Sequence, residues 1–363
     1  MLYQKLLRPI LFKFDPEFVH NRTIALGEFL GKSAVARAAV RAVCSIRMPP
    51  LPVTVAGLQF RNPIGLAAGF DKDARLLRIL PEVGFGFVEV GAVTRHPCPG
   101  NPGKRLLRLP RDKSIIVYYG LKNIGAEAVR NKLAATPMPI PLGVNIAKTN
   151  LPHIRGDKSI EDYLATYRLL APLAAYVTLN ISCPNTQDGC TFQDPRLLRD
   201  LLQEIGKEKK YGPIFLKISS HLSEREADAI LEVAENFPFI DGFVIGNLAK
   251  DRKALQLTSD KALLNRLPHG GISGAPVRAI ATNLLRYCYR ATKGKYTFIG
   301  VGGIFTGKDA YEKILAGASL VQIITGLIYG GPRTVYRIAR GLDLLLRQDG
   351  FRSVNEAVGA GVV

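Results

Sequence analysis

The sequence is poor in several residue types. Among 363 residues it has no tryptophan, three methionines and five cysteines. The cysteines are odd in number, widely spaced and form no CxxC pair; they are Cys44, Cys98, Cys183, Cys190 and Cys288. This pattern argues against a disulfide framework or a structural zinc site, so we expect no metal centre and a reducing compartment.

Long apolar runs are also missing. No stretch of about 18 consecutive apolar residues occurs, so the sequence predicts no transmembrane helix. Lys5, Arg8 and Lys13 interrupt the apolar residues at the N-terminus, which argues against a secretory core segment.

Acidic residues are scarce relative to basic ones. The chain has 30 Asp plus Glu against 49 Lys plus Arg, a formal net charge of +19. Such a chain could bind nucleic acid or an anionic membrane surface. Apolar residues make up 47% of the sequence, which excludes a disordered or low-complexity protein. The length allows one large α/β domain of roughly 250 residues with additions, or two ordinary domains.

The N-terminal residues predict amphipathic helices. Apolar residues recur every four positions from Leu2 to Phe14, and a second amphipathic stretch spans 23–44. Residues 1–48 carry eight Lys or Arg against three acidic residues, a net charge of +5. Basic amphipathic helices can lie in the headgroup layer of an anionic membrane. Alternatively, they dock on the main domain with a solvated basic face.

From about residue 60, short apolar runs alternate with helical patterns. The runs span 63–68, 85–90, 140–146, 176–182, 214–218, 242–246, 297–301 and 320–324, and helices are predicted at 159–170, 194–207, 223–235 and 308–315. Near-continuous apolar runs are typical of parallel strands that are buried on both faces. We therefore expect a (β/α)8 TIM barrel, with a doubly wound open sheet as the alternative. Segment 94–120 reads as an inserted loop or hairpin.

The ends of the last two strands predict an anion site. Gly300, Gly302 and Gly303 end the seventh run, and Thr325 and Gly326 follow the eighth. In such barrels these two loops commonly bind phosphate. The pattern does not match GxGxxG, so a dinucleotide is less favoured. The alternative is that these glycines only turn the chain.

Other chemically active residues also stand where apolar runs end. Lys72 and Lys217 each need an anionic or electron-rich partner if they are buried; for Lys72 the alternative is a pair with Asp71 or Asp73. Cys183 in NISCPNT follows a buried strand. It could act as a base or nucleophile, or be an inert core cysteine.

These motifs together resemble the dihydroorotate dehydrogenase family, flavin mononucleotide (FMN) enzymes of pyrimidine synthesis with a (β/α)8 barrel. The motifs are NPIGLAAGFDKD, VEVGAVT, GVNIAK, NISCPNT, GGISG, IGVGGI and GASLVQIITG, in order along nearly the whole chain. The N-terminal extension, with DPEFVH at 15–20, looks like that of the membrane-associated, quinone-linked class. His20 and Arg108 match family positions that line the quinone passage.

The resemblance implies a set of site residues. The flavin would contact Ala68, Gly69, Lys72, Asn145, Asn180, Lys217, Gly246, Gly274, Gly303, Ile324 and Thr325. The substrate would contact Lys72, Asn180, Asn185 and Asn247, and Cys183 would be the catalytic base.

The same resemblance implies an organisation and a setting for the chain. Residues 1–48 would form the membrane and quinone-access extension, and residues 49–363 the catalytic barrel. The partners would be a small-molecule substrate, a quinone and a membrane surface, at the cytoplasmic face of a bacterial inner membrane, with no nucleic acid.

Four positions depart from the family pattern. Cys183 stands where the quinone-linked class has serine, and Val117, Leu248 and Ala92 replace residues that are polar in the family. A buried polar group left unpaired costs roughly 1–3 kcal/mol. A divergent family member acting on another cyclic amide or enone is therefore the main alternative. More remote alternatives are an RNA dihydrouridine synthase-like enzyme and a membrane-binding protein that has lost its flavin.

Overall fold

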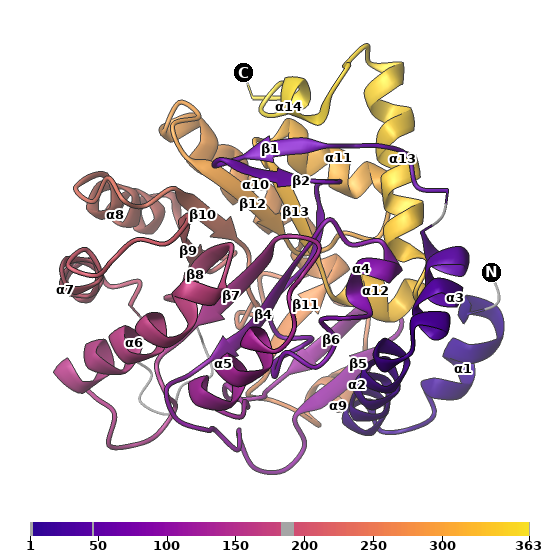
Figure 1. Ribbon diagram of the computed structural model, residues 1–363, viewed down its shortest axis with the longest axis horizontal. Helices are drawn as coiled ribbons and strands as arrows, with labels where there is room; N and C mark the ends of the chain where they lie inside the picture. The colour runs from indigo at the N-terminus through magenta and orange to yellow at the C-terminus, as the bar shows by residue number, and fades with distance from the viewer. Residues whose placement is uncertain (1–2, 46, 183–191, 363) are drawn as a thin grey trace.

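Eight parallel strands close into a barrel in the computed structural model, which describes residues 3–45, 47–182 and 192–362 (Figure 1). Around the barrel they run β10 (Gly242–Ile245), β12 (Thr297–Val301), β13 (Leu320–Ile323), β3 (Ile64–Leu66), β4 (Phe87–Val93), β7 (Leu142–Ile146), β8 (Tyr176–Asn180) and β9 (Ile214–Ile218). Each of the eight apolar runs forms one of these strands, which confirms the predicted barrel. The closed strand order excludes the open-sheet alternative.

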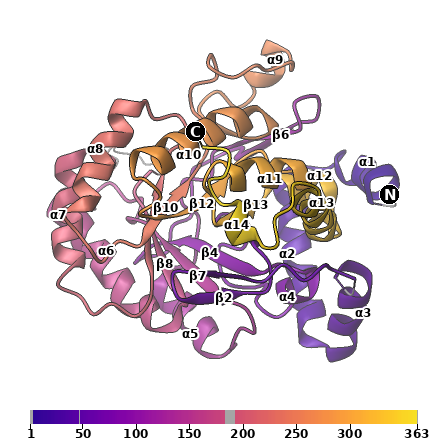
Figure 2. The same ribbon diagram turned by 90° about the horizontal axis from the view of Figure 1, so that it is seen from above.

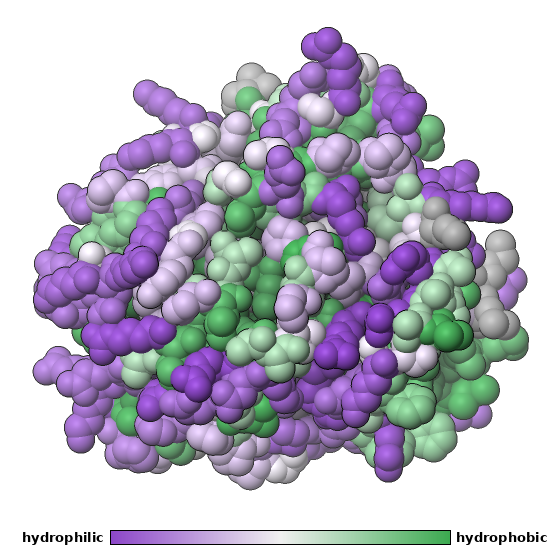
Figure 3. Space-filling view, viewed as in Figure 1, coloured by the Kyte–Doolittle hydropathy of each residue, from purple (hydrophilic) through white to green (hydrophobic). Residues whose placement is uncertain are grey.

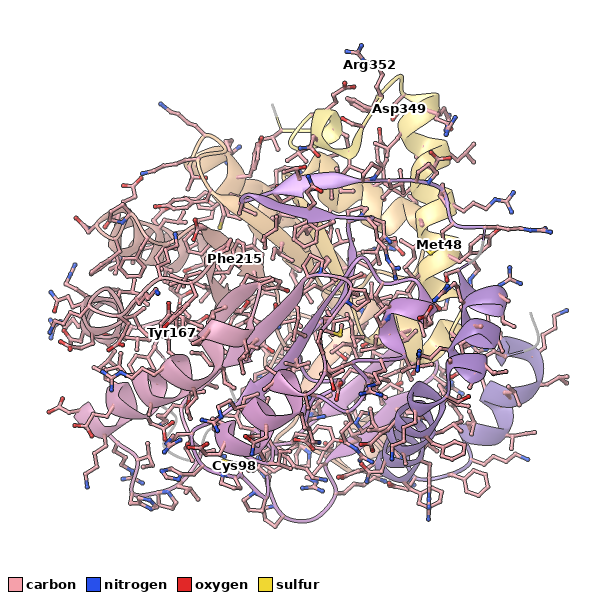
Figure 4. All side chains as sticks on the ribbon, in the orientation of Figure 1. Met48, Cys98, Tyr167, Phe215, Asp349 and Arg352 are labelled. Carbon is pink, nitrogen blue, oxygen red and sulfur yellow. The ribbon has the colours of Figure 1, made fainter. Side chains whose placement is uncertain are left out.

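The barrel strands are buried on both faces, as their composition requires. Every residue of β7, β8 and β9 is buried. The ring of Tyr176 packs edge-on against Phe87 and Phe215, with centroids 6.4 and 5.5 Å away. These aromatic rings fill one level of the barrel interior. Figure 4 shows side chains packed throughout the molecule and labels Phe215 of β9 and Tyr167 of α6 (Asp157–Leu170).

The other outer helices follow the strands in turn. They are α4 (Leu80–Val83), α5 (Ala126–Ala134), α7 (Pro195–Ile205), α8 (Glu224–Glu235), α9 (Lys261–Leu264), α10 (Arg278–Ala291), α11 (Gly307–Leu315), α12 (Thr325–Gly330), α13 (Thr334–Gln348) and α14 (Val354–Ala357). The four helices predicted from the sequence are all present. Capping boxes at Ser223 and Thr306 explain where α8 and α11 begin.

Helices also precede the barrel, as expected, but they are divided differently from the prediction. They are the π-helical turn η1 (Tyr3–Leu7), α1 (Arg8–Leu11), α2 (Pro16–Lys32) and α3 (Ala34–Cys44). The stretch 23–44 was predicted as one amphipathic unit. Ser33 interrupts it with an extended backbone, and its side chain accepts a hydrogen bond from the Ala36 N–H to cap α3. Within the described ranges, no helix is both long and apolar enough to cross a bilayer.

A three-stranded antiparallel sheet, β11–β6–β5, lies outside the barrel. The hairpin expected within 94–120 supplies β5 (Leu106–Leu109) and β6 (Ser114–Val117), and β11 (Gly271–Gly274) pairs with β6. Asp112, in the hairpin turn, accepts hydrogen bonds from the backbone N–H groups of Thr258 and Ser259. The hairpin is therefore fixed to the loop that follows β10. A small hairpin, β1 (Val53–Val55) and β2 (Leu58–Phe60), lies elsewhere on the barrel (Figure 1).

Candidate functional site

The carboxyl ends of the barrel strands bring together residues from distant parts of the sequence. The Gly69 N–H, after β3, donates to the carbonyl of Gly91 in β4 at 2.7 Å. A Cβ on Gly69 would lie 3.6 Å from Cδ1 of Ile324, after β13. Ala68, next to Gly69, is half-buried at the same point. Three of the positions expected at a flavin therefore meet where β3 and β13 end.

Lys72 is held over an aromatic ring instead of beside a carboxylate. Its Nζ donates to the carbonyl of Gly69 at 2.6 Å and lies 3.9 Å from the ring centroid of Tyr119. Asp71 accepts hydrogen bonds from the backbone N–H groups of Arg75 and Leu76. Burial lowers the pKa of Lys72 to about 8, although the nearby carboxylates oppose this shift. Its charge is therefore available to a ligand.

Asp73 does not form the alternative ion pair either. Its carboxylate accepts the backbone N–H of Ile124 at 3.1 Å. Across the described ranges, Lys72 forms no ion pair shorter than 4.0 Å with either neighbouring aspartate.

Asn145 and Lys217 are buried polar residues on the two strands that flank β8 in the barrel. Asn145 Nδ2 donates to Glu89 Oε1 at 2.8 Å, while its buried Oδ1 has no partner in the described part of the chain. Burial lowers the pKa of Lys217, and the negative charge of Glu89 opposes that shift. Among the described residues no carboxylate forms an ion pair with Lys217 within 4.0 Å. A buried acceptor and a buried cation of this kind are costly unless a ligand completes them. They fit a planar ring with polar edges, such as the flavin that the sequence implies.

The asparagines expected at the substrate form a short hydrogen-bonded chain. Asn247 Nδ2 donates to Ser182 Oγ at 3.0 Å, and that hydroxyl donates to Asn180 Oδ1 at 3.4 Å. Asn180 stands opposite Lys217 in the β8–β9 register. Cys183 and Asn185 lie outside the described residues. Ser182 therefore links Asn247 to Asn180, which are two of the expected substrate residues. Asn180 also lies beside Lys217 on the neighbouring strand.

The loops after β12 and β13 come into backbone contact with each other. A Cβ on Gly326 would lie 2.1 Å from the carbonyl oxygen of Ile304. Gly303 has φ +72, and a Cβ there would lie 2.3 Å from Cβ of Arg278. Side chains at these positions would collide with Ile304 and Arg278, so glycine is what allows the two loops to lie this close. The bare backbone fits an anion that approaches N–H groups closely.

Two further glycines from the expected set line neighbouring strand ends. A Cβ on Gly274 would lie 2.9 Å from Cγ2 of Thr325, whose hydroxyl is 2.9 Å from Ser273 Oγ. A Cβ on Gly246 would lie 2.6 Å from the carbonyl oxygen of Val301. Both glycines have positive φ, +100 and +124. The end of β11 therefore adjoins the start of α12.

His20 lies between the N-terminal helices and the barrel. Its ring packs edge-on against Phe70 with centroids 5.2 Å apart, and Tyr119 lies 6.4 Å away. Burial, together with the positive charges of Lys72, Lys122 and Arg75, lowers the pKa of His20 to about 3. The imidazole is therefore neutral. Through Phe70 it contacts the loop that carries Gly69.

Arg108 lies at the same boundary. Its Nη1 donates to the carbonyl of Phe14 at 2.8 Å, and its guanidinium lies 4.6 Å from the Phe12 ring centroid. Phe12 in turn packs edge-on against Tyr329 at 5.2 Å. Arg108 and Tyr329 thus connect the first helices to the hairpin and to α12.

Two of the positions that depart from the family pattern converge on one glycine. Val117 pairs with Gly271 across β6 and β11. A Cβ on Gly271 would lie 2.6 Å from Cβ of Leu248. Ala92 lies separately, half-buried after Gly91 in β4. Apolar side chains therefore border Gly271 from both the hairpin and the loop after β10.

Sequence reasoning overlooked three residues at the site. Glu89 is the only charged residue in the apolar run 85–90, a signal that could have been used. Tyr119 and Tyr329 carry no such local signal, because their contacts come from segments far away in the chain.

Comparisons with known proteins agree with this geometry. The family model described as dihydroorotate dehydrogenase matches residues 50–346. A protein named dihydroorotate dehydrogenase (quinone) from Mycobacterium sp. (strain KMS) is 39% identical over 356 residues, which covers 98% of each chain. A protein of the same name from Synechococcus sp. (strain JA-3-3Ab) is 41% identical over 350 residues, covering 94% of this chain and 92% of the relative.

Solved structures also resemble the chain closely. The crystal structure of ligand-free DHODH from Eimeria tenella superposes with a TM-score of 0.84 at 31% identity, covering 95% of this chain and 99% of the other. The Eimeria tenella DHODH in complex with ferulenol gives a TM-score of 0.80 at 30% identity, covering 95% of each chain. The likeness therefore includes both the barrel and the helices that precede it.

Proposed function

The chain belongs to the dihydroorotate dehydrogenase family, and from that premise we propose that it oxidises dihydroorotate to orotate in pyrimidine biosynthesis, with FMN as its cofactor and a quinone as electron acceptor. The observation that carries the proposal is the pair formed by Asn145 and Lys217, which flank β8 from β7 and β9. Asn145 offers a buried acceptor with no partner in the described ranges, and Lys217 offers a buried cation. FMN bound at this site would supply a two-electron acceptor for the hydride of the substrate, which a quinone would reoxidise.

The chain's own residues would hold the flavin from two sides. Lys217 and Asn145 supply a positive charge and a hydrogen-bond acceptor to the ring. The close-packed backbone at Gly303 and Gly326 supplies N–H groups to the phosphate. A side chain at Gly246 or Gly274 would collide with neighbouring backbone, and Gly69 has a positive φ of +111 that favours glycine. The remaining expected flavin contacts lie at or after the carboxyl ends of β3, β8 and β13; they are Ala68, Lys72, Asn180, Ile324 and Thr325.

The substrate would lie beside Lys72 and the asparagines. The Lys72 ammonium would pair with the substrate carboxylate, and Asn180, Asn185 and Asn247 would hold the amide groups of the ring. Cys183 would remove a ring proton at its Sγ while the hydride leaves from the neighbouring carbon. A cysteine can do this if its thiolate is accessible near the working pH.

A quinone would enter between the N-terminal helices and the barrel. His20 lies against Phe70, next to the flavin-side Gly69, so a quinone passing His20 would come close to the flavin. Arg108, at the contact with Phe14, would line the entrance. A neutral His20 suits a passage for an uncharged quinone.

The outer surface of these helices supports binding to a membrane. Of the twelve large apolar residues that are strongly exposed in the described ranges, nine lie in the N-terminal helices or the turn between α1 and α2: Leu6, Leu7, Ile10, Phe14, Phe18, Leu26, Phe29, Val35 and Val43. Figure 3 shows apolar surface gathered over this part of the molecule. A patch of this kind marks an interaction surface.

Charge supports the same surface. The carboxylate of Glu17 pairs with Arg105 and Lys122, and that of Glu28 pairs with Arg75. Both acidic residues of α2 are therefore turned to the barrel, which leaves basic residues among the exposed apolar ones. We assign the protein to the cytoplasmic face of a bacterial inner membrane, as a peripheral protein with residues 1–48 as the contact.

An anaerobic titration of the purified protein with dihydroorotate tests the function. The flavin absorbance should bleach on addition of dihydroorotate and return when a soluble ubiquinone analogue is added. Bound flavin that dihydroorotate does not bleach would disprove the substrate. A protein that remains colourless after reconstitution with FMN would disprove the cofactor.

A second candidate substrate is favoured by Val117 and Leu248. Both side chains border Gly271. The family resemblance implies polar residues at positions 117 and 248, so the ring of dihydroorotate would lose hydrogen-bond partners here. This candidate is another cyclic amide or enone on which the same site acts as an oxidoreductase. If it is correct, the Val117→Asn/Leu248→Thr variant should oxidise dihydroorotate faster than the wild type. No gain would favour dihydroorotate.

A further inference from the structure

Glu89 is a buried carboxylate that joins four strands of the barrel. Its side chain is fully buried in the interior. Oε1 accepts a hydrogen bond from Asn145 Nδ2 of β7 at 2.8 Å. Oε2 accepts three, from Gln322 Nε2 of β13 at 2.8 Å, Thr178 Oγ1 of β8 at 3.1 Å and Tyr176 OH of β8 at 3.2 Å.

This arrangement determines which way the neighbouring amides face. An ionised carboxylate only accepts hydrogen bonds, so Asn145 must turn its NH2 group to Glu89 and its carbonyl oxygen away. That oxygen, Oδ1, is buried and has no partner within the described ranges. The Gln322 amide is oriented in the same way, and its Oε1 is likewise buried and unpartnered there.

Glu89 also acts on the buried cation at the site. Its negative charge favours the ammonium form of Lys217. Lys217 and Asn145 are both expected flavin residues, and they come from β9 and β7, one on each side of β8. One carboxylate beneath the site therefore influences both.

We propose that Glu89 is a positioning residue that sets the hydrogen-bonding polarity of the cofactor site, because it fixes Asn145 as an acceptor towards the bound ring. The proposal rests on the proposed function, since it takes FMN as the ligand. The oxidised isoalloxazine ring has one N–H group, which needs an acceptor. If the side-chain amide of Asn145 were turned round, its NH2 group would face the N–H group of the ring, and two donors would then meet.

The Glu89→Gln variant reverses this polarity in a predictable way. The oxygen that receives three donors must remain an oxygen, so the Gln NH2 group takes the place of Oε1. Asn145 then has to turn its own oxygen to position 89, which presents NH2 to the ligand. We expect FMN to bind the Glu89→Gln apoprotein about 10- to 100-fold more weakly than the wild-type apoprotein, as measured by quenching of flavin fluorescence.

The Glu89→Gln/Asn145→Asp double variant is the decisive test. It transposes the charge between the two positions and keeps the total charge constant. The Gln NH2 group can donate to the new carboxylate, whose other oxygen again faces the ligand as an acceptor. We expect FMN affinity within about threefold of wild type. The matched single variant, Asn145→Asp, places two carboxylates face to face and should bind FMN weakly.

The outcomes separate positioning from simple structural support. Weaker binding in both single variants, with recovery in the double variant, supports the proposal. Unchanged FMN affinity in Glu89→Gln, or a double variant that regains its melting temperature but not its FMN affinity, overturns it. If Glu89→Gln alone does not fold, the FMN affinity of the double variant is compared with that of Asn145→Asp. Recovered affinity in the double variant supports the proposal, and equally weak binding overturns it. Wild-type apoprotein that binds no FMN overturns the cofactor and this proposal together.

Discussion

Glu28 of α2 and Arg75 of the loop after β3 form an ion pair that connects the N-terminal helices to the cofactor side of the barrel. Nε and Nη2 of Arg75 lie 2.8 and 2.5 Å from the same carboxylate oxygen. The backbone N–H of Arg75 also donates to Asp71, next to Lys72. Helix α2, which carries His20, therefore contacts the same loop that carries Lys72.

Breaking this ion pair should affect electron transfer more than folding. Both side chains are about a third exposed, at 33% and 35%, so the pair contributes less than about 1 kcal/mol to stability. Glu28→Gln should leave dihydroorotate-driven bleaching unchanged but lower quinone reduction roughly threefold, because α2 positions His20. Stopped-flow measurement of the two half-reactions checks this.

The matched control is Glu82→Gln, which breaks the pair with Arg41 between α3 and α4. That pair also anchors an N-terminal helix but is not on the helix that carries His20. Equal loss of quinone reduction in both variants would mean that only general docking of the helices matters.

The pKa of Lys72 predicts weaker FMN binding at alkaline pH. Burial places this pKa at about 8 in the ligand-free protein, below the ordinary value of 10.5. The ammonium is therefore present below pH 8 and is lost above it, so affinity for a flavin whose electron-rich ring contacts this ammonium should fall by up to about tenfold per pH unit above pH 8. FMN titrations of apoprotein from pH 6.5 to 9.5 measure this decline.

Lys72→Arg should remove this part of the pH dependence, because arginine stays charged throughout the range. The same depressed pKa means that the folded apoprotein gains stability as the pH rises from 8 to 10.5, while the penalty for burying the charge is complete below pH 8. An identical decline in wild type and variant would assign it to another group.

The exposed apolar residues of the first helices predict vesicle binding. Phe29 is 70% exposed, and its insertion should contribute about 1.5 kcal/mol, or roughly tenfold in the dissociation constant. Phe29→Ser should therefore bind vesicles of phosphatidylglycerol and phosphatidylethanolamine about tenfold more weakly in a sedimentation assay.

Tyr211→Ser serves as the control. Tyr211 is 47% exposed and lies between α7 and β9, and Figure 2 shows α7 on the opposite side of the molecule from α1 and α3. Equal loss of binding in both variants would exclude the first helices as the specific membrane contact.

Lys313 of α11 is a buried lysine that lies outside the site. Its Nζ donates to Thr282 Oγ1 at 3.0 Å, and burial lowers its pKa to about 7. Lys313→Met should stabilise the protein by on the order of 2 kcal/mol at pH 6. Wild type should recover this difference as the pH rises from 7 to 10.5. In this range the buried lysine is neutral and gains a proton on unfolding, and this uptake favours unfolding less as the pH rises. Denaturant unfolding at pH 6 and pH 9 measures both effects, and a less stable variant at pH 6 would contradict the prediction.

Cys183 is predicted to be the base that removes the substrate proton. Cys183→Ala should slow dihydroorotate-driven bleaching by at least about 100-fold while FMN affinity is retained. Cys183→Ser should keep part of the activity, with its pH profile shifted, because the hydroxyl is a weaker acid than the thiol. Full activity of the alanine variant across pH would assign the proton transfer elsewhere.

The sequence predicted the barrel well because its signal is local. Strands buried on both faces are continuous apolar runs, and 214–218 and 297–301 have the bounds of β9 and β12. The break at Ser33 was missed because apolar residues continue with helical spacing on both sides of it. The serine itself is a common N-cap residue and was a usable signal.

The expected site residues were found through motifs in the sequence. The residues that the motifs missed make their contacts with segments far away in the chain. The resemblance pointed to Asn145 and Lys217 individually. It could not show that Glu89 orients Asn145, because the donors to Glu89 come from β7, β8 and β13. Tyr119 was missed for the same reason, since only folding brings its ring under Lys72.

The three-stranded sheet β11–β6–β5 has a consequence for how this enzyme can diversify. Its hydrogen-bond ladder is separate from that of the barrel, and it carries Val117 and Gly271, with Leu248 against it. We expect substitutions at Val117 and Leu248 to change which substrates are accepted while the ladder of the barrel strands stays intact, although the same sheet ends at Gly274, an expected flavin contact. We therefore expect relatives to differ in substrate choice at Val117 and Leu248 more readily than in the register of the barrel strands.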